Sequence, residues 1–395
     1  MTDDRRALAR FAGALFFGGM YLGMLPLAVG KVGDFGHFWS AGHAVAADPA
    51  QMYSADAHRP IVLGLEGGAS LWNERADRVG AFFYPPPAAF WYGFLGEFDY
   101  KIAAAIQGLV TLVSVACASV CVAALSGRRL APATVAILVL ASPTCLYAYA
   151  LGQNGLMTLA VASAGALALA RDRDGVAGAV LSLLACKPSW TLGLGWVPLA
   201  LGRWRAIVAF LVGALAAAVL AAGAFGPQRF IEYVQVAGLV SRLDRLPEYP
   251  AAHQHNLYAL ARSALGVGVT TDLVAVTAGL AVIGLTVWRF GGPRRPMSLE
   301  AAGAFFAAGT LANPHVHHYD MLPMCVAIAA IAAAFPATMR GRVVAGAVVA
   351  FWYVSFFVGE QLDAGFSIPA IANLLVWAWL VASSWLVAPP AVARV

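Results

Sequence analysis

The sequence predicts an all-α, polytopic integral membrane protein, a bundle of about twelve transmembrane helices with a long first external loop. Of its 395 residues, 61% are apolar and only 11% are charged, and its mean hydropathy is +0.75. Ordinary soluble domains carry roughly 25% charged residues. Uncharged stretches of about 17 to 25 residues, the length that crosses the hydrocarbon core of a bilayer, are the expected alternative to a soluble core.

Twelve apolar runs are the candidate spans. They are 7–30, 102–125, 131–150, 155–170, 175–187, 189–201, 206–225, 270–289, 299–312, 321–336, 343–358 and 367–388. Several are shorter than a full crossing, which indicates either half-membrane helices or frayed helix boundaries. The weakest pair meets at Lys187-Pro188. A single helix over 175–201 would leave eleven spans and move everything after it to the opposite side.

Basic residues decide between these counts, because short cytoplasmic loops retain Lys and Arg. With twelve spans, most of the 25 basic residues lie at cytoplasmic helix ends. A break at Lys187-Pro188 keeps Arg171 and Arg203 on the same side. We therefore expect twelve spans, with both termini in the cytoplasm.

Two segments, 31–100 and 226–269, interrupt the helical pattern. The first contains Tyr84-Pro85-Pro86-Pro87, which cannot continue a helix. Non-helical backbone at membrane depth needs protein or a wet cavity around it, so both segments are expected as external loops packed on the bundle. No linker separates a second domain, so residues 1–395 are predicted to form one membrane domain. The chain lacks a phosphate-binding GxxxxGK[ST] loop and a dinucleotide glycine motif, and no nucleic acid partner is expected.

The remaining polar residues gather on the non-cytoplasmic side of this arrangement. All eight histidines lie there, together with Asp34, Gln153, Asn154, Lys187, Asp320, Glu360 and Asp363. Each has a structural explanation when taken alone: Asp34 could cap a helix, Lys187 could snorkel to the headgroups, and the histidines could be interfacial turn residues. Those explanations do not account for the shared side. Because polar groups are costly in a membrane, their gathering predicts a common cavity.

Six sequence landmarks follow one another in a recognisable order. They are Gly33-Asp34-Phe35-Gly36-His37-Phe38-Trp39, Tyr53 after Asp48-Pro49, Tyr84-Pro85-Pro86, Gly152-Gln153-Asn154-Gly155, Lys187-Pro188, and Asn313-Pro314-His315 leading to Tyr319-Asp320. This order resembles the GT-C glycosyltransferases, and more narrowly glycosyltransferase family 87, the polyprenyl-phosphate-mannose-dependent α-mannosyltransferases. The resemblance implies a GT-C-like bundle, a catalytic acid in the first external loop, a lipid-phosphate-linked sugar donor and an inverting transfer.

The resemblance carries over to individual positions. Asp34 would be the catalytic acid residue, and His315 would line the same pocket as a second catalytic residue. The adjacent imidazoles of His317 and His318 depart from the pattern, and the second acid that some GT-C enzymes place beside the first is not evident.

The chemistry of such a transfer suits these residues. It needs a base for the acceptor hydroxyl and cations for the departing phosphate. Asp34 can be the base, and Lys187, with Arg59 or Arg262, can bind the phosphate. Sugar and lipid contacts are assigned to Tyr84, Gln153, Asn154, His317, His318 and Asp320. No cofactor is expected. Histidines and acids together could hold a divalent metal, but the loose His-x-His-His spacing does not favour one.

Two other functions compete with this hypothesis. A transporter or lipid flippase would use Lys187 and the Asp34 region as its substrate path, but transporters commonly show two similar halves, which this chain lacks. An acyltransferase would need one dominant histidine within a span. The expected location is a bacterial inner membrane, with the site facing the periplasm or exterior. The sugar, the acceptor (a glycolipid or a glycan), the linkage and the oligomeric state stay open, mannose being implied by the resemblance alone.

Overall fold

A computed structural model describes residues 3–30, 33–71, 82–243, 253–293, 295–334, 338–361 and 366–383. The described structure is 81% helix and contains no strand, so the all-α prediction is confirmed. The helices are α1 (Asp3–Gly30), α2 (Asp34–Ala47), α3 (Ala55–Leu63), α4 (Gly68–Leu71), α5 (Ala89–Gly96), α6 (Tyr100–Leu125), α7 (Pro132–Leu140), α8 (Pro143–Ala150), α9 (Gly155–Ala170), α10 (Asp174–Leu181), α11 (Pro188–Leu194), α12 (Val197–Ala200), α13 (Trp204–Phe225), α14 (Gln228–Leu243), α15 (Leu257–Leu265), α16 (Val269–Phe290), α17 (Leu299–Ala312), α18 (Met324–Ala333), α19 (Met339–Gln361) and α20 (Ile368–Ser383). Short 3-10 turns are η1 (Pro49–Gln51), η3 (Pro86–Ala88), η4 (Ser182–Cys186) and η6 (His318–Met321).

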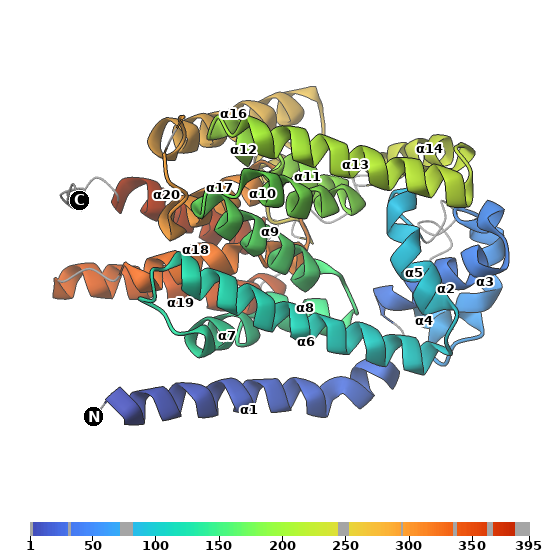
Figure 1. Cartoon of the computed structure of the whole chain (residues 1–395), viewed down its shortest axis with the longest axis horizontal. Helices are drawn as coiled ribbons and strands as arrows, with labels where there is room; N and C mark the ends of the chain where they lie inside the picture. Colours follow the sequence, from blue (N-terminus) through green and yellow to red (C-terminus); the bar gives the residue numbers. More distant parts are fainter. Residues whose placement is uncertain are drawn as a thin grey trace.

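The long helices form a bundle with a separate helical lobe at one end. In Figure 1 the lobe, α2 to α5, lies at the right beside the start of α6 and the end of α13, and α1 begins at the opposite end of the bundle. The lobe has its own buried apolar cluster, which includes Phe38 and Met52 and extends to Ala103 of α6 and Val236 of α14. The described part of the segment predicted as a first loop, 33–71 and 82–100, is largely helical.

Among the described residues, four helices are long and apolar enough to cross a membrane: α6, α13, α16 and residues 339–358 of α19. The bent pair of α7 and α8 would make a fifth. The other predicted spans coincide with apolar helices of 10–17 residues, except for 189–201, which is divided into the shorter helices α11 and α12. Along α13, Trp204, Leu211 and Leu215 are exposed, an apolar surface that lipid would cover and water would not. Membrane association follows, and the count of twelve crossings stays a prediction.

The predicted span 131–150 is bent rather than straight. Helix α7 ends before Ser142, α8 begins at Pro143, and their axes differ by 69°. Carbonyls freed by the bend cannot find water in a bilayer core. Three hydroxyls serve them: Tyr353 donates to the carbonyl of Leu138 at 2.5 Å, Ser142 to Val139 at 2.6 Å, and Tyr21 to Leu140 at 2.9 Å. The carbonyl groups at the bend are thus hydrogen-bonded within the protein.

The weakest predicted pair of spans forms a helical hairpin that turns at Lys187. Helix α10 continues through η4 to Cys186, Lys187 leaves the helical conformation with φ −138° and ψ 84°, and α11 begins at Pro188. At the other end of the hairpin, Arg203 forms an ion pair with Asp172 at 2.7 Å. This contact places Arg171 and Arg203 at the same end of the bundle, as a break at Lys187-Pro188 requires.

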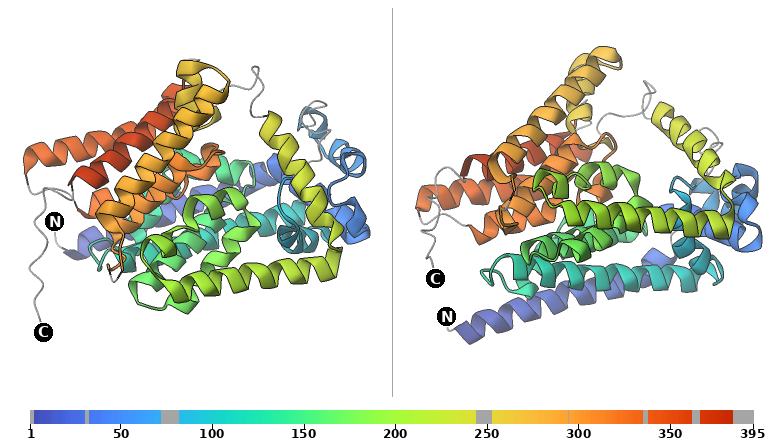
Figure 2. Two further views of the ribbon diagram at one scale, coloured as in Figure 1. Left: turned by 90° about the horizontal axis from the view of Figure 1, so that it is seen from above. Right: turned by 45° about the horizontal axis from the view of Figure 1, so that its top comes forward.

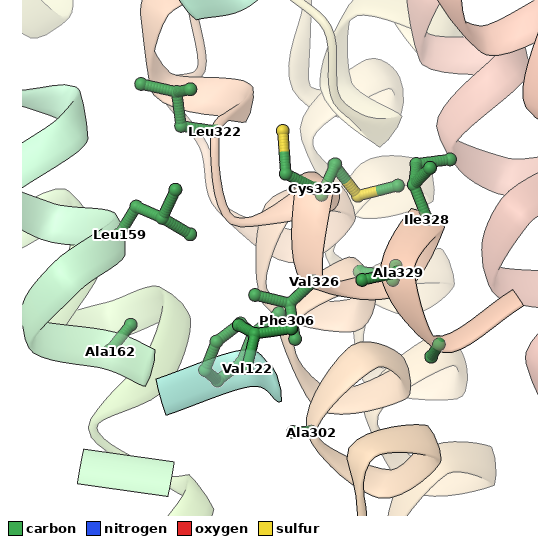
Figure 3. Packing of buried hydrophobic residues seen from close by; sticks show 14 of the residues in the cluster. Val122, Leu159, Ala162, Ala302, Phe306, Leu322, Cys325, Val326, Ile328 and Ala329 are labelled. Carbon is green, nitrogen blue, oxygen red and sulfur yellow. The ribbon is translucent and has the colours of Figure 1, made fainter. Parts of the chain in front are cut away.

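A second hairpin, made by α17 and α18, turns through residues 313–323. At the beginning of α17, Glu300 forms an ion pair with Arg129 at 2.6 Å. Helix α18 is buried along almost its whole length, and Figure 3 shows Leu322, Cys325 and Val326 packed opposite Leu159 of α9.

Two glycines bring the hairpins together. A Cβ atom on Gly309 of α17 would lie 2.1 Å from the carbonyl oxygen of Gly193 of α11. Small residues allow helix backbones to approach closely inside membranes. The right-hand view of Figure 2 shows the green α9 to α12 segments lying between the orange hairpin and α6. This contact fixes the turn at Lys187 beside the turn of the second hairpin.

The substitution Gly309→Ala should therefore separate the hairpins and lower the free energy of unfolding by about 1–3 kcal/mol, the range of overpacking changes. Gly346→Ala in α19 is the matched control, since nothing lies within 4 Å of its added Cβ, and it should be neutral or slightly stabilising. Thermal unfolding of the purified protein in detergent measures both. Equal melting temperatures for the two variants would contradict this account of the packing.

Candidate functional site

The turn Gly152-Gln153-Asn154-Gly155 lies between two other segments of the chain. The amide of Phe35 donates to the carbonyl of Leu151 at 2.9 Å. Gly152 has φ +66°, and a Cβ there would lie 2.5 Å from Cβ of Phe35. A Cβ on Gly155 would lie 2.3 Å from the carbonyl oxygen of Tyr319. Both glycines are thus needed to insert Gln153 and Asn154 between the start of α2 and η6.

Gln153 binds the acid at the first turn of α2. Its Nε2 donates to Oδ2 of Asp34 at 2.6 Å, and its Oε1 accepts from the hydroxyl of Tyr84 at 3.3 Å. Tyr84 is buried and is held by the lobe, where its carbonyl accepts from the hydroxyl of Tyr53 at 2.8 Å. The extended backbone at Pro85, which precedes η3, lets Tyr84 enter the site.

Asn154 binds the cation at the turn of the first hairpin. Its Oδ1 accepts from Nζ of Lys187 at 3.0 Å, and Nζ also lies 2.5 Å from Oδ1 of Asp320. The ring centroid of Tyr319 is 5.5 Å from the same ammonium. Lys187 is 9% exposed and Asp320 1%. A buried charge is tolerated only when it is paired and hydrogen-bonded. Asp320 supplies the opposite charge to Lys187, and Asn154 supplies a hydrogen-bond acceptor.

The electrostatic environment of Asp34 differs from that of a surface carboxylate. Burial raises its pKa, against the lowering effects of the hydrogen bond from Gln153 and the positive potentials of His37 and Lys187. Burial prevails, so the pKa of Asp34 lies above its ordinary value. A carboxylate of raised pKa is a stronger base than a solvated one once it is ionised.

The histidines divide between two environments. The backbone amide of His317 donates to Oδ2 of Asp320 at 3.2 Å, and the ring of His315 lies 4.5 Å from that of His317. His318 instead contacts His255, with 2.9 Å between Nδ1 and Nε2, and stacks on Tyr147. His315 and His317 thus lie at the Asp320 side of the site, while His318 faces a different partner.

The structure brings together most of the side chains predicted for the site. Direct contacts join Asp34, Tyr84, Gln153, Asn154, Lys187 and Asp320. Arg59 is exposed on α3, and Arg262 is buried on α15, so their roles at the phosphate stay predictions. The side chain of Glu360, and the whole of Asp363, lie outside the described residues.

Three residues of the site had been given no role from the sequence. Tyr92 stacks on Tyr84 with 5.6 Å between ring centroids, and its hydroxyl lies 3.5 Å from Nδ2 of Asn154. Tyr319 covers Lys187, and His37 acts on Asp34 from the next turn of α2. The sequence signal for His37 was its position three residues after Asp34, which puts both on one helix face. Tyr92 lies among many aromatics and gave no signal.

One depression among the described residues is not lined by the charged residues of the site. It is bordered by Gly33, Phe35, Gln107, Tyr149 and Gly152, with neighbours on α6 and α8. It adjoins Asp34 and Gln153 only through their chain neighbours. In the described ranges, no group of three or more His, Cys, Asp or Glu side chains is arranged to hold a metal.

A family model for glycosyltransferase family 87 matches residues 82–314, more than half of the chain. The chain belongs to glycosyltransferase family 87. This confirms the resemblance and assigns glycosyltransferase activity. No curated protein and no solved structure matches it. The match includes Tyr84, Gln153, Asn154 and Lys187, whereas Asp34 precedes it and His315 follows it, so the geometry of the site is what links Asp34 to the family region.

The two members of the buried ion pair, Lys187 and Asp320, should be strongly coupled in their effects on stability. Removing one partner leaves an unpaired buried charge, so Asp320→Asn and Lys187→Met should each lower the free energy of unfolding by about 3–5 kcal/mol. The double variant should lose much less free energy of unfolding than the sum of the losses in the two single variants. Thermal or denaturant unfolding of all four proteins measures the coupling, and additive losses would show that the two groups do not interact.

Proposed function

We propose that this glycosyltransferase moves a sugar from a polyprenyl-phosphate donor to a hydroxyl of a glycolipid or glycan acceptor, with inversion at the sugar carbon. The sugar is mannose, as the resemblance implies. One observation carries the proposal: the carboxylate of Asp34 and the ammonium of Lys187 are bound by two consecutive residues, Gln153 and Asn154. A base and a phosphate-binding cation are the two charges that this reaction needs.

Asp34 is the base in this mechanism. Gln153 fixes one carboxylate oxygen, Oδ2, and we assign the other oxygen to take the proton from the acceptor hydroxyl. The acceptor oxygen then attacks the sugar carbon as the bond to the phosphate breaks. The raised pKa of Asp34 suits proton transfer from a weakly acidic alcohol, because a base is most effective when its pKa approaches the working pH.

Lys187 binds the departing phosphate. A lysine ammonium has three donors, and its contacts with Asp320 and Asn154 use two of them. We assign the third to a phosphate oxygen. Asp320 balances the ammonium before the donor binds, so Asp320 positions Lys187, in place of the sugar contact expected from the sequence.

The arrangement of the two charges supports inversion. Inverting transfer requires the base and the leaving group on opposite faces of the sugar. We place the sugar along the Gln153-Asn154 turn, between the carboxylate of Asp34 that Gln153 binds and the ammonium of Lys187 that Asn154 binds. Tyr84 and Tyr92, stacked at the same turn, offer hydroxyls and ring faces to it.

The orientation of the chain in the membrane supports a site facing the periplasm or exterior. Arg129 and Arg203 mark the ends of the two hairpins that lie away from the turns carrying Lys187 and Asp320. Short loops rich in Arg stay in the cytoplasm. We therefore propose that the protein lies in a bacterial inner membrane, with both termini in the cytoplasm and with Asp34 and Lys187 toward the opposite face. The alternative function, a transporter, would use Lys187 as part of a substrate path. However, Lys187 contacts both Asp320 and Asn154, and membership of the family favours the transferase.

Asp34→Asn should lower sugar transfer by about 10²–10⁴-fold, the usual contribution of a general base, with little loss of fold. The assay is transfer from polyprenyl-phosphate mannose to membrane glycolipids in vesicles containing the folded protein. Asp56→Asn, which changes an exposed acid on α3 of the same lobe, is the control and should keep wild-type turnover. Near-normal turnover of the Asp34→Asn variant would remove Asp34 from the role of base.

The pH profile should report the same carboxylate. Protonated Asp34 cannot act as a base, so kcat/KM should rise with pH through a value above about 3.9, the pKa of a solvated aspartate. Gln153→Leu removes a hydrogen bond that lowers the pKa of Asp34, so the acid limb of its residual activity should move to higher pH. A limb that moves to lower pH in that variant would contradict the assignment.

A further inference from the structure

Helix α14 turns away sharply from the end of α13. Gly226, between the two helices, has φ +88°, a left-handed conformation that glycine adopts readily. Both views of Figure 2 show the yellow-green α14 running across the direction of α13 rather than continuing it. Because α13 is long and apolar enough to cross a membrane, a helix that runs across its end is oriented along the membrane surface.

One face of α14 packs on the helical lobe. Val236 is buried in the apolar cluster of the lobe, and the ring centroid of Tyr233 lies 6.3 Å from that of Tyr53. Arg229 donates to the carbonyl oxygen of Ala50 at 2.7 Å. The three residues of α14 follow one another at intervals of four and three positions, which puts them on one face of the helix. The lobe therefore covers this face.

The face of α14 away from the lobe is apolar and exposed. Ile231 is 55% exposed and Val234 is 68% exposed, and Gly238, about one turn further, is exposed as well. With 3.6 residues per turn, these three positions lie on the side of the helix opposite to Tyr233. Large exposed apolar side chains that gather on one helix face indicate contact with another apolar surface or with lipid.

Polar side chains border this apolar face. Gln235 and Arg242 are exposed along one edge of it. A long basic side chain can keep its stem on an apolar surface while its charge stays among the headgroups. A helix with one apolar face and polar or basic edges is typical of helices that lie in the membrane interface. The surface of α14 has this pattern.

The apolar face of α14 continues the lipid-facing surface of α13. Val219 and Leu220 are exposed, less than two turns before α13 ends at Phe225. The ring of Phe225 lies 4.8 Å from that of Phe90 of α5, which is 45% exposed. Exposed aromatic rings at the end of a membrane-crossing helix are typical of the membrane–water interface. The boundary of the bilayer therefore falls at the turn from α13 to α14, where lipid can cover the apolar face.

Contacts through the lobe connect α14 to the proposed site. The ring of Tyr233 lies beside that of Tyr53, whose hydroxyl donates to the carbonyl of Tyr84 at 2.8 Å. The hydroxyl of Tyr84 donates to Gln153 at 3.3 Å, and Gln153 donates to Asp34. A helix that rests on the bilayer can thus support the residues that hold the carboxylate of Asp34.

We propose that α14 is an interfacial helix whose face with Ile231, Val234 and Gly238 lies among the lipid headgroups and the upper acyl chains. The partner of this surface is the lipid bilayer, and the opposite face of the helix supports the lobe. The helix thereby holds the lobe, and Asp34 with it, at the membrane surface. This inference concerns membrane contact and goes beyond the chemistry of sugar transfer, so it holds whichever sugar or acceptor the enzyme uses.

Quenching by brominated lipids tests this placement without any enzymatic activity. A fluorescent amino acid is placed at position 234 or at position 63. Leu63 is a matched control, because it is an apolar residue of the lobe that is 42% exposed on α3, which lies farther from the bundle in Figure 1. Each protein is reconstituted in phosphatidylcholine vesicles with acyl chains brominated near the headgroup. Position 234 should lose most of its emission, and position 63 should keep it. Quenching at position 234 that is no stronger than at position 63 would overturn the proposal.

A charge on the apolar face tests the consequence for the lobe. A carboxylate is costly among acyl chains, so Val234→Asp should lower kcat/KM for a polyprenyl-phosphate sugar in vesicles by about tenfold. Leu63→Asp should keep wild-type kcat/KM, and both variants should keep the wild-type melting temperature in detergent, because both positions are exposed. Wild-type kcat/KM for Val234→Asp would overturn the support of the lobe by the bilayer.

The two measurements also separate this proposal from the proposed function. A wild type whose position 234 is quenched by brominated lipid, but which transfers no sugar from polyprenyl-phosphate mannose, would reject the proposed donor and support the interfacial helix. Sugar transfer without quenching at position 234 would do the opposite.

Discussion

The ion pair between Lys187 and Asp320 is the contact on which the site depends. Its two members lie at the turns of two different helical hairpins, and both are almost fully buried. Neither charge would be stable there alone. The pair therefore fixes the hairpins relative to each other at the place proposed for the donor phosphate. It also allows a cation to lie in a region where an unpaired charge would be unstable.

Glycines make that pair geometrically possible. Gly309 and Gly193 let the hairpins touch along their backbones, and Gly152 and Gly155 let the turn that carries Gln153 and Asn154 fit between α2 and η6. The polar contacts then span three layers: the lobe with Asp34, the turn with two amides, and the hairpins with Lys187 and Asp320. Close backbone contact inside a membrane thus replaces the hydrophobic driving force that water would supply.

Much of the site could be predicted from the sequence because its members are polar residues in an apolar chain. Asp34, Gln153 and Lys187 stand out against their surroundings, and the basic residues place them on one side. The bend between α7 and α8 could not be predicted, because the hydroxyls that stabilise it, such as Tyr353 and Tyr21, are distant in sequence. Tyr92 was missed for a similar reason: nothing distinguishes it from aromatics that only pack.

The short helices have a functional consequence. A continuous span places its ends at the membrane surfaces, whereas a hairpin such as the one at Lys187 can place its turn, and any charge on it, inside the bundle. The family match covers this hairpin but not Asp34, so in the proposed mechanism the region shared with the family supplies the phosphate-binding side and the amide that orients the base. The proposed base comes from the lobe, where the carboxylate of Asp34 accepts a hydrogen bond from Gln153. On this proposal, donor binding and acceptor activation are built on separate parts of the chain that meet at the Gln153-Asn154 turn.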